Sequence, residues 1–324
     1  MMISVCIPVY NTEKVLERCL ESLAKQDFDS FEIVLVNDCS PGKNEKNWSC
    51  SKIIKKFKKT TKIPVNYIEN AHNLGTLEVR RTLTYEAKGE YIFFLDSDDI
   101  IPPNALSVLY KEAVKTDADI IHGTLISGSY EDGKFTKGEK QRLNKTYIGQ
   151  LSNHDIFTKT FIEKQDAMIL CSKLIKTKLL IDAFELIPFT YCITAEDYLI
   201  LFFASLNAHS YSGIESEVYY YINTEGLTST KKITDLESCV KLSTASSVFT
   251  IIKTWIDENP SALNPKEVDE IREDAITHLY SNYTHLEALC DPSIKDETMK
   301  ILNEFWGESF VNLIKNSLNH SKKE

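Results

Sequence analysis

The stretch Tyr91-Ile92-Phe93-Phe94-Leu95-Asp96-Ser97-Asp98-Asp99 is the most informative part of this 324-residue chain. Its first five residues form an apolar run of strand length, and three carboxylates follow within four positions. Carboxylates this close repel one another unless a partner of opposite charge offsets the repulsion. Carboxylate oxygens suit magnesium or manganese ions. We therefore predict a divalent metal ion held by Asp98, Asp96 and Asp99.

A second interpretation of these acids is that they only cap the helix expected after Pro103. Asn104 can cap that helix by itself, and a helix cap does not need three carboxylates. We therefore favour the metal site.

Strand and helix patterns alternate over residues 1–126. Apolar residues at helical spacing separate the strands, and Thr12 is placed to cap the first helix. Such alternation predicts an α/β fold with a mostly parallel central sheet and helices on both faces. Short apolar runs place the strands at 3–9, 31–36, 65–68, 91–95 and 120–126.

The remainder of the chain is less regular. Residues 127–150 are polar and are expected to form a loop, whereas 151–210 have a helical pattern interrupted near Pro188. A further strand is predicted at 218–222. From about residue 233 onward the pattern is helical, with two apolar stripes.

Polar residues follow three of the predicted strands at their carboxyl ends. They are Tyr10-Asn11, Asn37-Asp38 and the acids at 96–99. Ligands of parallel sheets bind beyond the carboxyl ends of the strands, so we expect these groups to converge. The Tyr10 ring could stack on a pyrimidine base, and the Asp38 carboxylate could accept the ring N–H of that base. Each is a weak signal alone, because aspartate is common in turns.

Two further segments carry candidate site residues, each with a simpler alternative. Asn73-Leu74-Gly75 and Arg80 could bring a backbone bend and a guanidinium to a nucleotide, or could be a loop glycine and half of an exposed Arg80-Arg81 pair. Glu196-Asp197 opens an apolar helical stretch, where the helix dipole favours acids, and Thr194 stands close to a capping-box position. A functional role for this pair requires that the helix start faces the acidic cluster.

Charge excludes one class of partner and suggests another. A net charge of −10 argues against nucleic-acid binding. The stretch from Lys43 to Lys62 is an exception, with eight lysines and one acid. It is interpreted as a solvated helix face, with contact to anionic lipid headgroups as the alternative.

Membrane-spanning and secretory segments are not expected. No run of about 18 apolar residues occurs, and the first residues lack the basic region and cleavage site of a signal peptide.

The eight cysteines show no CxxC spacing and the seven histidines are scattered, which indicates reduced thiols and no zinc site. The 11 glycines form no Gly-x-Gly, which excludes the dinucleotide fingerprint and disfavours a nucleotidyltransferase loop. No GxxxxGKS/T or GxSxG motif occurs either.

In their order along the chain, the candidate motifs resemble glycosyltransferase family 2, whose members are inverting enzymes with the GT-A fold. The resemblance covers about residues 1–230. It departs at Val79-Arg80-Arg81-Thr82-Leu83, where A-R-N-x-G is usual, and at Ile222-Asn223, where a basic residue is common. The matching motifs are Pro8-Val9-Tyr10-Asn11, Val36-Asn37-Asp38-Cys39-Ser40, Asn73-Leu74-Gly75 with Arg80, the DxD-like Phe94-Leu95-Asp96-Ser97-Asp98-Asp99, Glu196-Asp197, Tyr219-Tyr220-Tyr221 and Gly226-Leu227-Thr228-Ser229-Thr230.

The resemblance implies a nucleoside-diphosphate sugar as donor, with a UDP-sugar expected. Tyr10 would stack on the base, Asp38 would accept the ring N–H and Asp96 would reach the ribose. Asp98, together with Asp99, would hold manganese or magnesium on the diphosphate. The residues implied in nucleotide-sugar binding are Pro8, Tyr10, Asn11, Asp38, Asn73, Gly75, Arg80, Asp96 and Ser97.

The catalytic residues implied by the resemblance are Asp197 and Glu196. Asp197 would take the proton of an acceptor hydroxyl that attacks the anomeric carbon, and one displacement would invert the configuration. The expected acceptor is a glycan or a lipid-linked oligosaccharide of cell-surface polysaccharide or lipooligosaccharide synthesis. The alternative is a nucleotide-sugar-binding or nucleotidyltransferase-like protein without glycosyl transfer.

Two domains are expected, a GT-A domain at 1–230 and a helical region at 231–324. The helical region has several interpretations: it shapes the acceptor site, mediates self-association as a homo-oligomer, contacts the membrane or caps the core. The expected location is the cytoplasm, with peripheral contact to the inner face of the membrane as an option.

Overall fold

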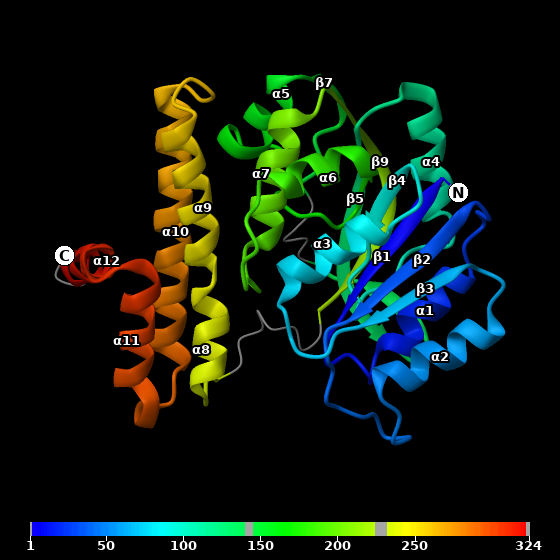
Figure 1. The fold of residues 1–324 in the computed structure, drawn as a ribbon, viewed down its shortest axis with the longest axis horizontal. Coiled ribbons are helices and arrows are strands. Elements are labelled where there is room, and N and C mark those ends of the chain that lie inside the picture. Colours follow the sequence, from blue (N-terminus) through cyan, green and yellow to red (C-terminus); the bar gives the residue numbers. More distant parts are fainter. Residues whose placement is uncertain (1, 140–144, 224–231, 322–324) are drawn as a thin grey trace. The chain divides into compact units, whose positions relative to one another are not determined.

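The computed structural model describes residues 2–139, 145–223 and 232–321. The chain divides into two compact units, the first made of residues 1–188 and 200–224 and the second of 189–199 and 225–324. Figure 1 shows the first unit built on a sheet and the second mainly on helices. The division into functional domains at residue 230 stays a prediction.

The described strands of the first unit form one nine-stranded sheet. They are β1 (Ile3–Val9), β2 (Phe31–Asn37), β3 (Val65–Glu69), β4 (Tyr91–Phe94), β5 (Ile120–Glu131), β6 (Lys134–Lys137), β7 (Gly149–Ser152), β8 (Lys173–Lys176) and β9 (Ser210–Ile222). The order is β3-β2-β1-β4-β8-β5-β9-β7, with β6 paired to β5. The neighbours β3, β2, β1 and β4 run parallel, as do β5 and β9, whereas β8 lies antiparallel between β4 and β5. The predicted α/β architecture is therefore confirmed, with a parallel half and a mixed half.

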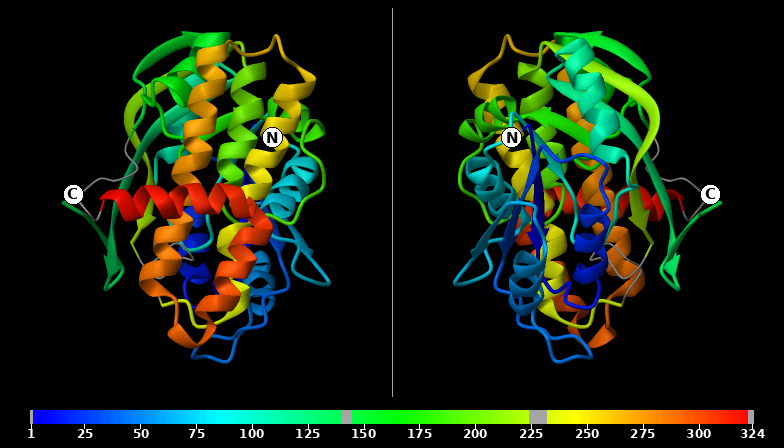
Figure 2. Two further views of the ribbon diagram at one scale, coloured as in Figure 1. Left: turned by 90° about the vertical axis from the view of Figure 1, so that its left-hand side faces the viewer. Right: turned by 90° about the vertical axis from the view of Figure 1, so that its right-hand side faces the viewer.

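Helices cover both faces of the parallel half, whose strands β1, β2 and β4 are buried on both faces. On one face, the alternate residues Ile3, Val5 and Ile7 of β1 join a core with buried residues of α1, α2 and α4. On the other face α3 contacts β1, and the Cys6 thiol donates to the Leu83 carbonyl at 3.7 Å. Figure 2 shows α1 and α3 on opposite sides of β1. The helices are α1 (Leu16–Ala24), α2 (Cys50–Thr60), α3 (Thr76–Glu86), α4 (Ala105–Thr116), α5 (His154–Phe157), the π-helix η1 (Thr158–Ile162), α6 (Thr177–Glu185) and α7 (Glu196–Asn207), which begins in the second unit and continues into the first.

The sequence prediction was wrong for residues 127–150. Instead of a loop, β5 continues to Glu131 and folds back as β6, and β7 pairs with β9. These strands lie at the edge of the sheet, where exposed polar side chains replace the apolar pattern. The predicted helical stretch 151–210 also contains β8, whose four residues are held by strands distant in sequence. The last predicted strand begins at Ser210, not at residue 218.

Neither predicted helix cap forms as expected. The helix α1 begins at Leu16, and the Thr12 hydroxyl donates instead to Ser97 Oγ at 2.9 Å. Asn104 occupies the N-cap position of α4, but its side chain makes no capping hydrogen bond. The Thr12 hydroxyl therefore bonds Ser97, which is distant in sequence, and not a backbone amide of the helix.

The second unit is helical, as predicted from residue 233 onward. Its longest helix starts with a capping box, in which Asn264 and Glu267 bond each other's backbone amides. Phe249 and Trp306 pack with ring centroids 6.0 Å apart. None of the helices in the described residues is long and apolar enough to span a bilayer. The helices are α8 (Leu236–Ser243), α9 (Ala245–Glu258), α10 (Pro265–Leu289), the 3-10 helix η2 (Pro292–Ile294), α11 (Lys295–Trp306) and α12 (Glu308–Ser321).

Candidate active site

The segment Asp96–Asp99, here called the acidic turn, follows β4 at the carboxyl edge of the sheet. Its amide at Asp99 donates to the Asp96 carbonyl at 3.1 Å, which closes the turn. Tyr219 of β9 holds both ends. Its hydroxyl accepts from the Asp96 amide at 3.1 Å and donates to Asp99 Oδ2 at 2.8 Å. These two hydrogen bonds hold the acidic turn against β9.

Asp99 is the most buried of the three acids, with 1% of its surface exposed. Its second oxygen accepts the Ile222 amide at 2.8 Å, so both oxygens already have partners. Burial, and then the charges of Asp98 and Asp96, raise the pKa of Asp99 well above its usual value. This geometry supports an anchoring role for Asp99, and its part in holding a metal stays a prediction.

Among the three acids, Asp98 has the fewest contacts that offset the negative charge of its carboxylate. Burial, and then the charge of Asp96, raise the pKa of Asp98 to about 6. The Arg18 guanidinium donates to the backbone carbonyl of Asp98 at 2.5 Å, and within the described residues no side chain forms a hydrogen bond or ion pair with the Asp98 carboxylate. A nearby cation would remove this electrostatic penalty.

The carboxylates around Asp98 fit a magnesium-type ion that is bound partly by the protein and partly by a phosphate of the substrate. No three His, Cys, Asp or Glu side chains converge on a metal position anywhere in the described ranges. Magnesium is commonly bound through one or two carboxylates together with substrate phosphates and waters. Asp98 and Asp96 could supply that number of carboxylates, so the metal prediction requires the diphosphate as a further ligand.

Asp96 is oriented from two sides. Arg80 lies 3.2 Å from Oδ1, and the Cys171 thiol donates to Oδ2 at 3.3 Å. The Arg80 guanidinium is buried and lies 5.1 Å from the Phe94 ring centre. These contacts leave the Asp96 side chain 31% exposed, which is compatible with its predicted contact to a ribose.

The neighbouring Arg81 belongs to a different part of the fold. It pairs with Glu78 at 2.8 Å and donates to the carbonyls of Phe184 and Ile187 at the end of α6. The sequence left open which arginine reaches the site. The structure turns Arg80 toward the acidic turn and Arg81 toward α6.

Asp38 connects the end of β2 to the loop before α3. Its carboxylate accepts from the Asn70 side chain at 2.7 Å and from the Leu74 and Gly75 amides at 2.9 and 3.0 Å. Gly75, with φ of 84°, is the N-cap of α3, and this left-handed conformation favours glycine. The Asn73 side chain donates to the Asp38 carbonyl at 3.4 Å. A carboxylate accepts about four hydrogen bonds, so a base N–H would compete with these donors.

The ends of β1 and β2 are joined beside Asp38. Pro8 pairs with Val36 within the sheet, and Tyr10 is half-buried just beyond it. Asn11 has a left-handed φ of 54° and its amide donates to Ser40 Oγ at 3.1 Å. The first unit therefore brings the predicted donor-site residues to one edge of its sheet. Ser97 is joined to the end of β1 by the hydrogen bond from the Thr12 hydroxyl.

Sequence reasoning missed Arg18 and Cys171. Arg18 lies on α1, with its guanidinium between the Asp98 carbonyl and the ring of Tyr130, 5.4 Å away. Cys171 precedes β8, which reaches the centre of the sheet only through long-range pairing. Neither residue lies in a motif. Only the long-range strand and helix contacts bring them to the acidic turn.

Glu196 and Asp197 open α7 and belong to the second unit. Ala195 precedes them with a left-handed φ of 64°, a costly conformation for a non-glycine residue. The Thr194 hydroxyl reaches the Lys241 and Leu242 carbonyls at 3.2 Å, so it is directed toward the end of α8. The catalytic roles of Glu196 and Asp197 stay predictions.

The sheet order and the acidic turn define the class of fold. The chain superposes on a crystal structure of residues 1–349 of TarS from Staphylococcus aureus with a TM-score of 0.56 at 21% identity, covering 99% of this chain and 92% of that chain. A structure of the same fragment in complex with UDP-GlcNAc has a TM-score of 0.56 at 20% identity, with the same coverage. This likeness confirms the predicted GT-A fold with its C-terminal helices.

The family follows from the sequence match. The model of glycosyl transferase family 2 matches residues 4–175, more than half of the chain, and the chain belongs to this family. The poly(ribitol-phosphate) beta-N-acetylglucosaminyltransferase TarS of Staphylococcus aureus is 29% identical over 228 residues, 68% of this chain and 35% of TarS. Glycosyltransferase GlyG of Streptococcus pneumoniae is 32% identical over 134 residues, 41% of this chain and 42% of GlyG. The chain thus spans less than half the length of these relatives.

Proposed function

We propose that this chain is an inverting glycosyltransferase that moves a sugar from a UDP-sugar to a hydroxyl of a glycan or lipid-linked acceptor. Family membership and the TarS complexes with UDP and UDP-GlcNAc support this choice of reaction and donor. The names of the curated relatives support a role in cell-surface polysaccharide synthesis. A cytoplasmic location with peripheral contact to the membrane's inner face is part of the proposal.

The observation that carries the proposal is the uncompensated Asp98 carboxylate, in a turn whose two ends both bond the Tyr219 hydroxyl of β9. Asp96 beside it is oriented by Arg80, and Asp38 holds the loop at 70–75. These groups would bind the ribose, diphosphate and base of the donor at one edge of the sheet. A manganese or magnesium ion, when bound at Asp98 and Asp96, would neutralise charge on the leaving diphosphate.

Asp197 is proposed as the general base, with Glu196 next to it. Its carboxylate would accept the proton of the acceptor hydroxyl while that oxygen attacks the anomeric carbon. The bond to the anomeric carbon forms as the bond to the UDP oxygen breaks, so the configuration inverts. No covalent intermediate on the protein is needed.

UDP release from a panel of UDP-sugars, with manganese or with EDTA, tests this function. We expect metal-dependent UDP release with at least one donor, and none from Asp98→Asn. Nucleotide binding without turnover across the whole panel would instead support a nucleotide-sugar-binding protein. Release of pyrophosphate from a nucleoside triphosphate and a sugar phosphate would support the nucleotidyltransferase alternative.

A further inference from the structure

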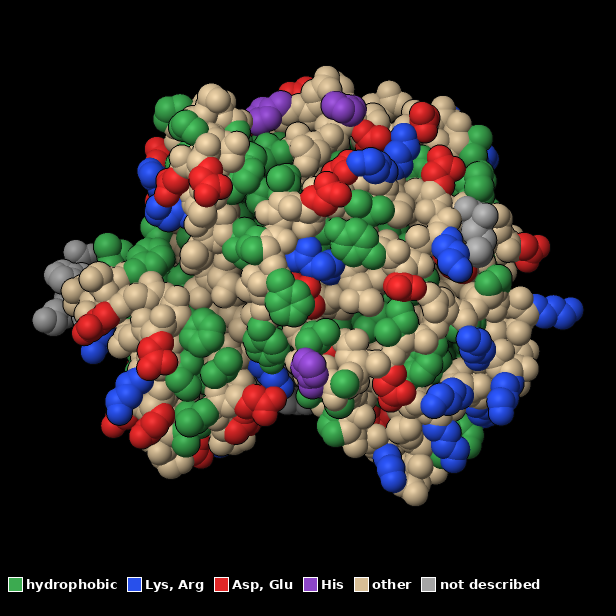
Figure 3. All heavy atoms as spheres, viewed as in Figure 1, with side chains coloured by type: hydrophobic (Ala, Val, Ile, Leu, Met, Phe, Trp, Pro, Cys, Tyr) green, Lys and Arg blue, Asp and Glu red, His purple; other side chains and the backbone are tan. Residues whose placement is uncertain are grey.

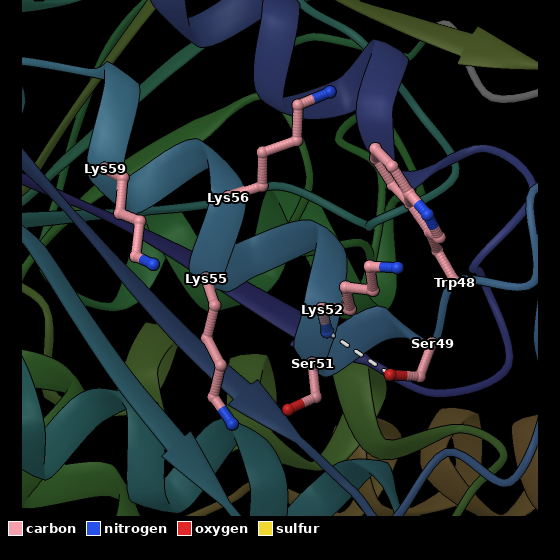
Figure 4. Close-up of a pocket in the computed structure, with 7 residues that line it drawn as sticks. All are labelled: Trp48, Ser49, Ser51, Lys52, Lys55, Lys56 and Lys59. Carbon is pink, nitrogen blue, oxygen red and sulfur yellow. Dashed lines mark hydrogen bonds between the residues drawn. The ribbon is translucent and has the colours of Figure 1, made fainter.

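The proposed chemistry leaves unused a basic pocket on the outer side of α2. Figure 3 shows lysine side chains gathered over α2, at the lower right of the view. Figure 4 shows four of them projecting from successive turns of the helix, with an indole ring beside two of them. The pocket, here called the α2 surface, has a volume of about 450 Å³ and is lined by Trp48, Ser49, Ser51, Lys52, Lys55, Lys56 and Lys59.

Positive charge on the α2 surface is concentrated and largely unpaired. The stretch from Lys43 to Lys62 has eight lysines and one acid, in a chain whose net charge is −10. Lys56 lies 3.6 Å from Glu17 of α1. Lys55 and Lys59 are exposed and form no ion pair within the described residues. A partner with spread negative charge would therefore meet several unneutralised ammonium groups.

The polar groups of the α2 surface are not arranged to grip one defined anion. Ser49 accepts the Lys52 amide at 3.2 Å as the helix cap, and the Ser51 hydroxyl donates to Glu69 at 3.1 Å. Both hydroxyls are therefore engaged, and no arginine is present to bind a phosphate with two parallel hydrogen bonds. Flexible lysines acting as point charges suit a diffuse anionic surface.

Trp48 supplies the apolar part of the α2 surface. The ammonium groups of Lys52 and Lys56 lie 4.8 and 4.5 Å from its ring centre. Tryptophan is enriched where protein meets the headgroup region of a bilayer, because its ring is apolar and its N–H is polar. Lysine and tryptophan together favour a lipid surface over a soluble phosphate polymer.

We propose that the α2 surface docks this protein on bilayers rich in anionic phospholipid headgroups. The start of α2 is tied to the edge of the sheet that carries the donor site, through the Cys50 thiol to Glu13 at 3.5 Å and through Ser51 to Glu69. Docking would hold that edge next to the lipid phase, where a lipid-linked acceptor lies. The purpose of docking rests on the proposed function, whereas the binding itself does not.

Co-sedimentation of the full chain with vesicles tests the docking. We compare phosphatidylcholine vesicles with vesicles containing phosphatidylglycerol, at low and high salt, and expect binding only to the anionic vesicles at low salt. One lysine near an anionic surface contributes about fivefold to binding, so Lys55→Glu/Lys59→Glu should weaken it at least about 25-fold. The matched control is Lys111→Glu/Lys115→Glu on α4, with the same spacing and charge change, which should bind as the wild type does.

Tryptophan emission reports whether Trp48 enters the headgroup region. Anionic vesicles should shift the emission of the wild type to the blue, and Trp48→Phe should lose that shift while still sedimenting with the vesicles. Equal binding to neutral vesicles, unchanged binding of Lys55→Glu/Lys59→Glu, or a preference for soluble polyphosphate over vesicles would overturn the proposal. UDP release in vesicle-free buffer monitors the donor site separately, so failure of docking and failure of the proposed function are distinguishable.

Discussion

Two adjacent arginines of α3 have different partners in the fold. Arg80 and Arg81 stand side by side in α3, yet one meets Asp96 and the other the end of α6. In a helix, neighbours in sequence point about 100° apart, so they serve different faces. Arg80 therefore stays a proposed donor-site residue, whereas Arg81 links α3 to the end of α6.

Replacing each arginine by alanine should therefore separate binding from stability. Arg80→Ala removes the partner of Asp96 and should weaken UDP binding at least about tenfold. Arg81→Ala should lower the free energy of unfolding by about 1–3 kcal/mol, because several hydrogen bonds to carbonyls are lost. UDP titration and urea unfolding of both variants measure this, and similar UDP affinities in the two variants would contradict the assignment.

Asp98 should show opposite effects on stability and on ligand response. The fold disfavours its charge, since burial raises its pKa to about 6, so Asp98→Asn should not lower the melting temperature in EDTA. Manganese with UDP should raise the melting temperature of the wild type and leave that of the variant almost unchanged. Equal stabilisation of both proteins by manganese and UDP would rule out Asp98 as a metal ligand.

The strand β9 holds both ends of the acidic turn through the Tyr219 hydroxyl. Tyr219→Phe removes a hydroxyl that bonds both ends of the turn. We expect the free energy of unfolding to fall by about 1–3 kcal/mol, and kcat/KM for UDP release to fall as well. The control is Tyr220→Phe, because the Tyr220 ring lies next to Tyr219 in the sequence but stacks on Phe135, with ring centroids 4.2 Å apart. If the two variants behave alike, β9 does not position the turn.

A buried ionic cluster joins β5, β8 and β9. Asp166 lies 2.7 Å from His122 of β5 and 3.4 Å from Lys173 of β8, and the hydroxyl of Tyr211 in β9 donates to it at 2.8 Å. Burial alone would raise the pKa of Asp166, but His122, the Lys173 ammonium group and hydrogen bonds keep it well below its usual value. Burial also lowers the pKa of His122, so Lys173 is the partner of Asp166 that is charged at neutral pH. The ionised Asp166 therefore stabilises the mixed half of the sheet.

The sign of the resulting pH dependence follows from that lowered pKa. A depressed pKa in the folded state contributes stability above the unfolded value, 3.8, and this contribution is lost as pH falls further. Wild-type stability should thus decrease below about pH 4, and Asp166→Asn should be less stable at pH 7 with a flatter acid limb. Chemical unfolding between pH 7 and 3 measures both slopes, and parallel curves would contradict the assignment.

The sequence predicted the elements that carry strong apolar patterns. The buried strands β1, β2 and β4 and the helices between them were found because their burial leaves a local hydrophobic signal. The strands β6, β7 and β8 were missed because they are short, and their pairing partners lie far away in sequence. The carboxylates proposed to hold a metal stand next to one another in the sequence, whereas Arg18 and Cys171 reach the acidic turn only through tertiary packing.

At the scale of the whole molecule, the proposed donor-binding residues and the proposed base belong to different compact units. Donor binding and proton transfer should therefore be separable. Asp197→Ala should abolish sugar transfer and leave UDP affinity nearly unchanged, because Asp197 is proposed to meet only the acceptor hydroxyl. Transfer assays and UDP titrations measure the two steps, and wild-type turnover of Asp197→Ala would show that the base is another residue.

We propose that the acidic turn holds the diphosphate of a UDP-sugar through a divalent ion. Calorimetric titration of UDP into the full chain, with manganese and with EDTA, tests it most directly. We expect binding that requires manganese in the wild type and that is lost in Asp98→Asn. Binding of equal strength in EDTA, or in Asp98→Asn with manganese, would contradict it.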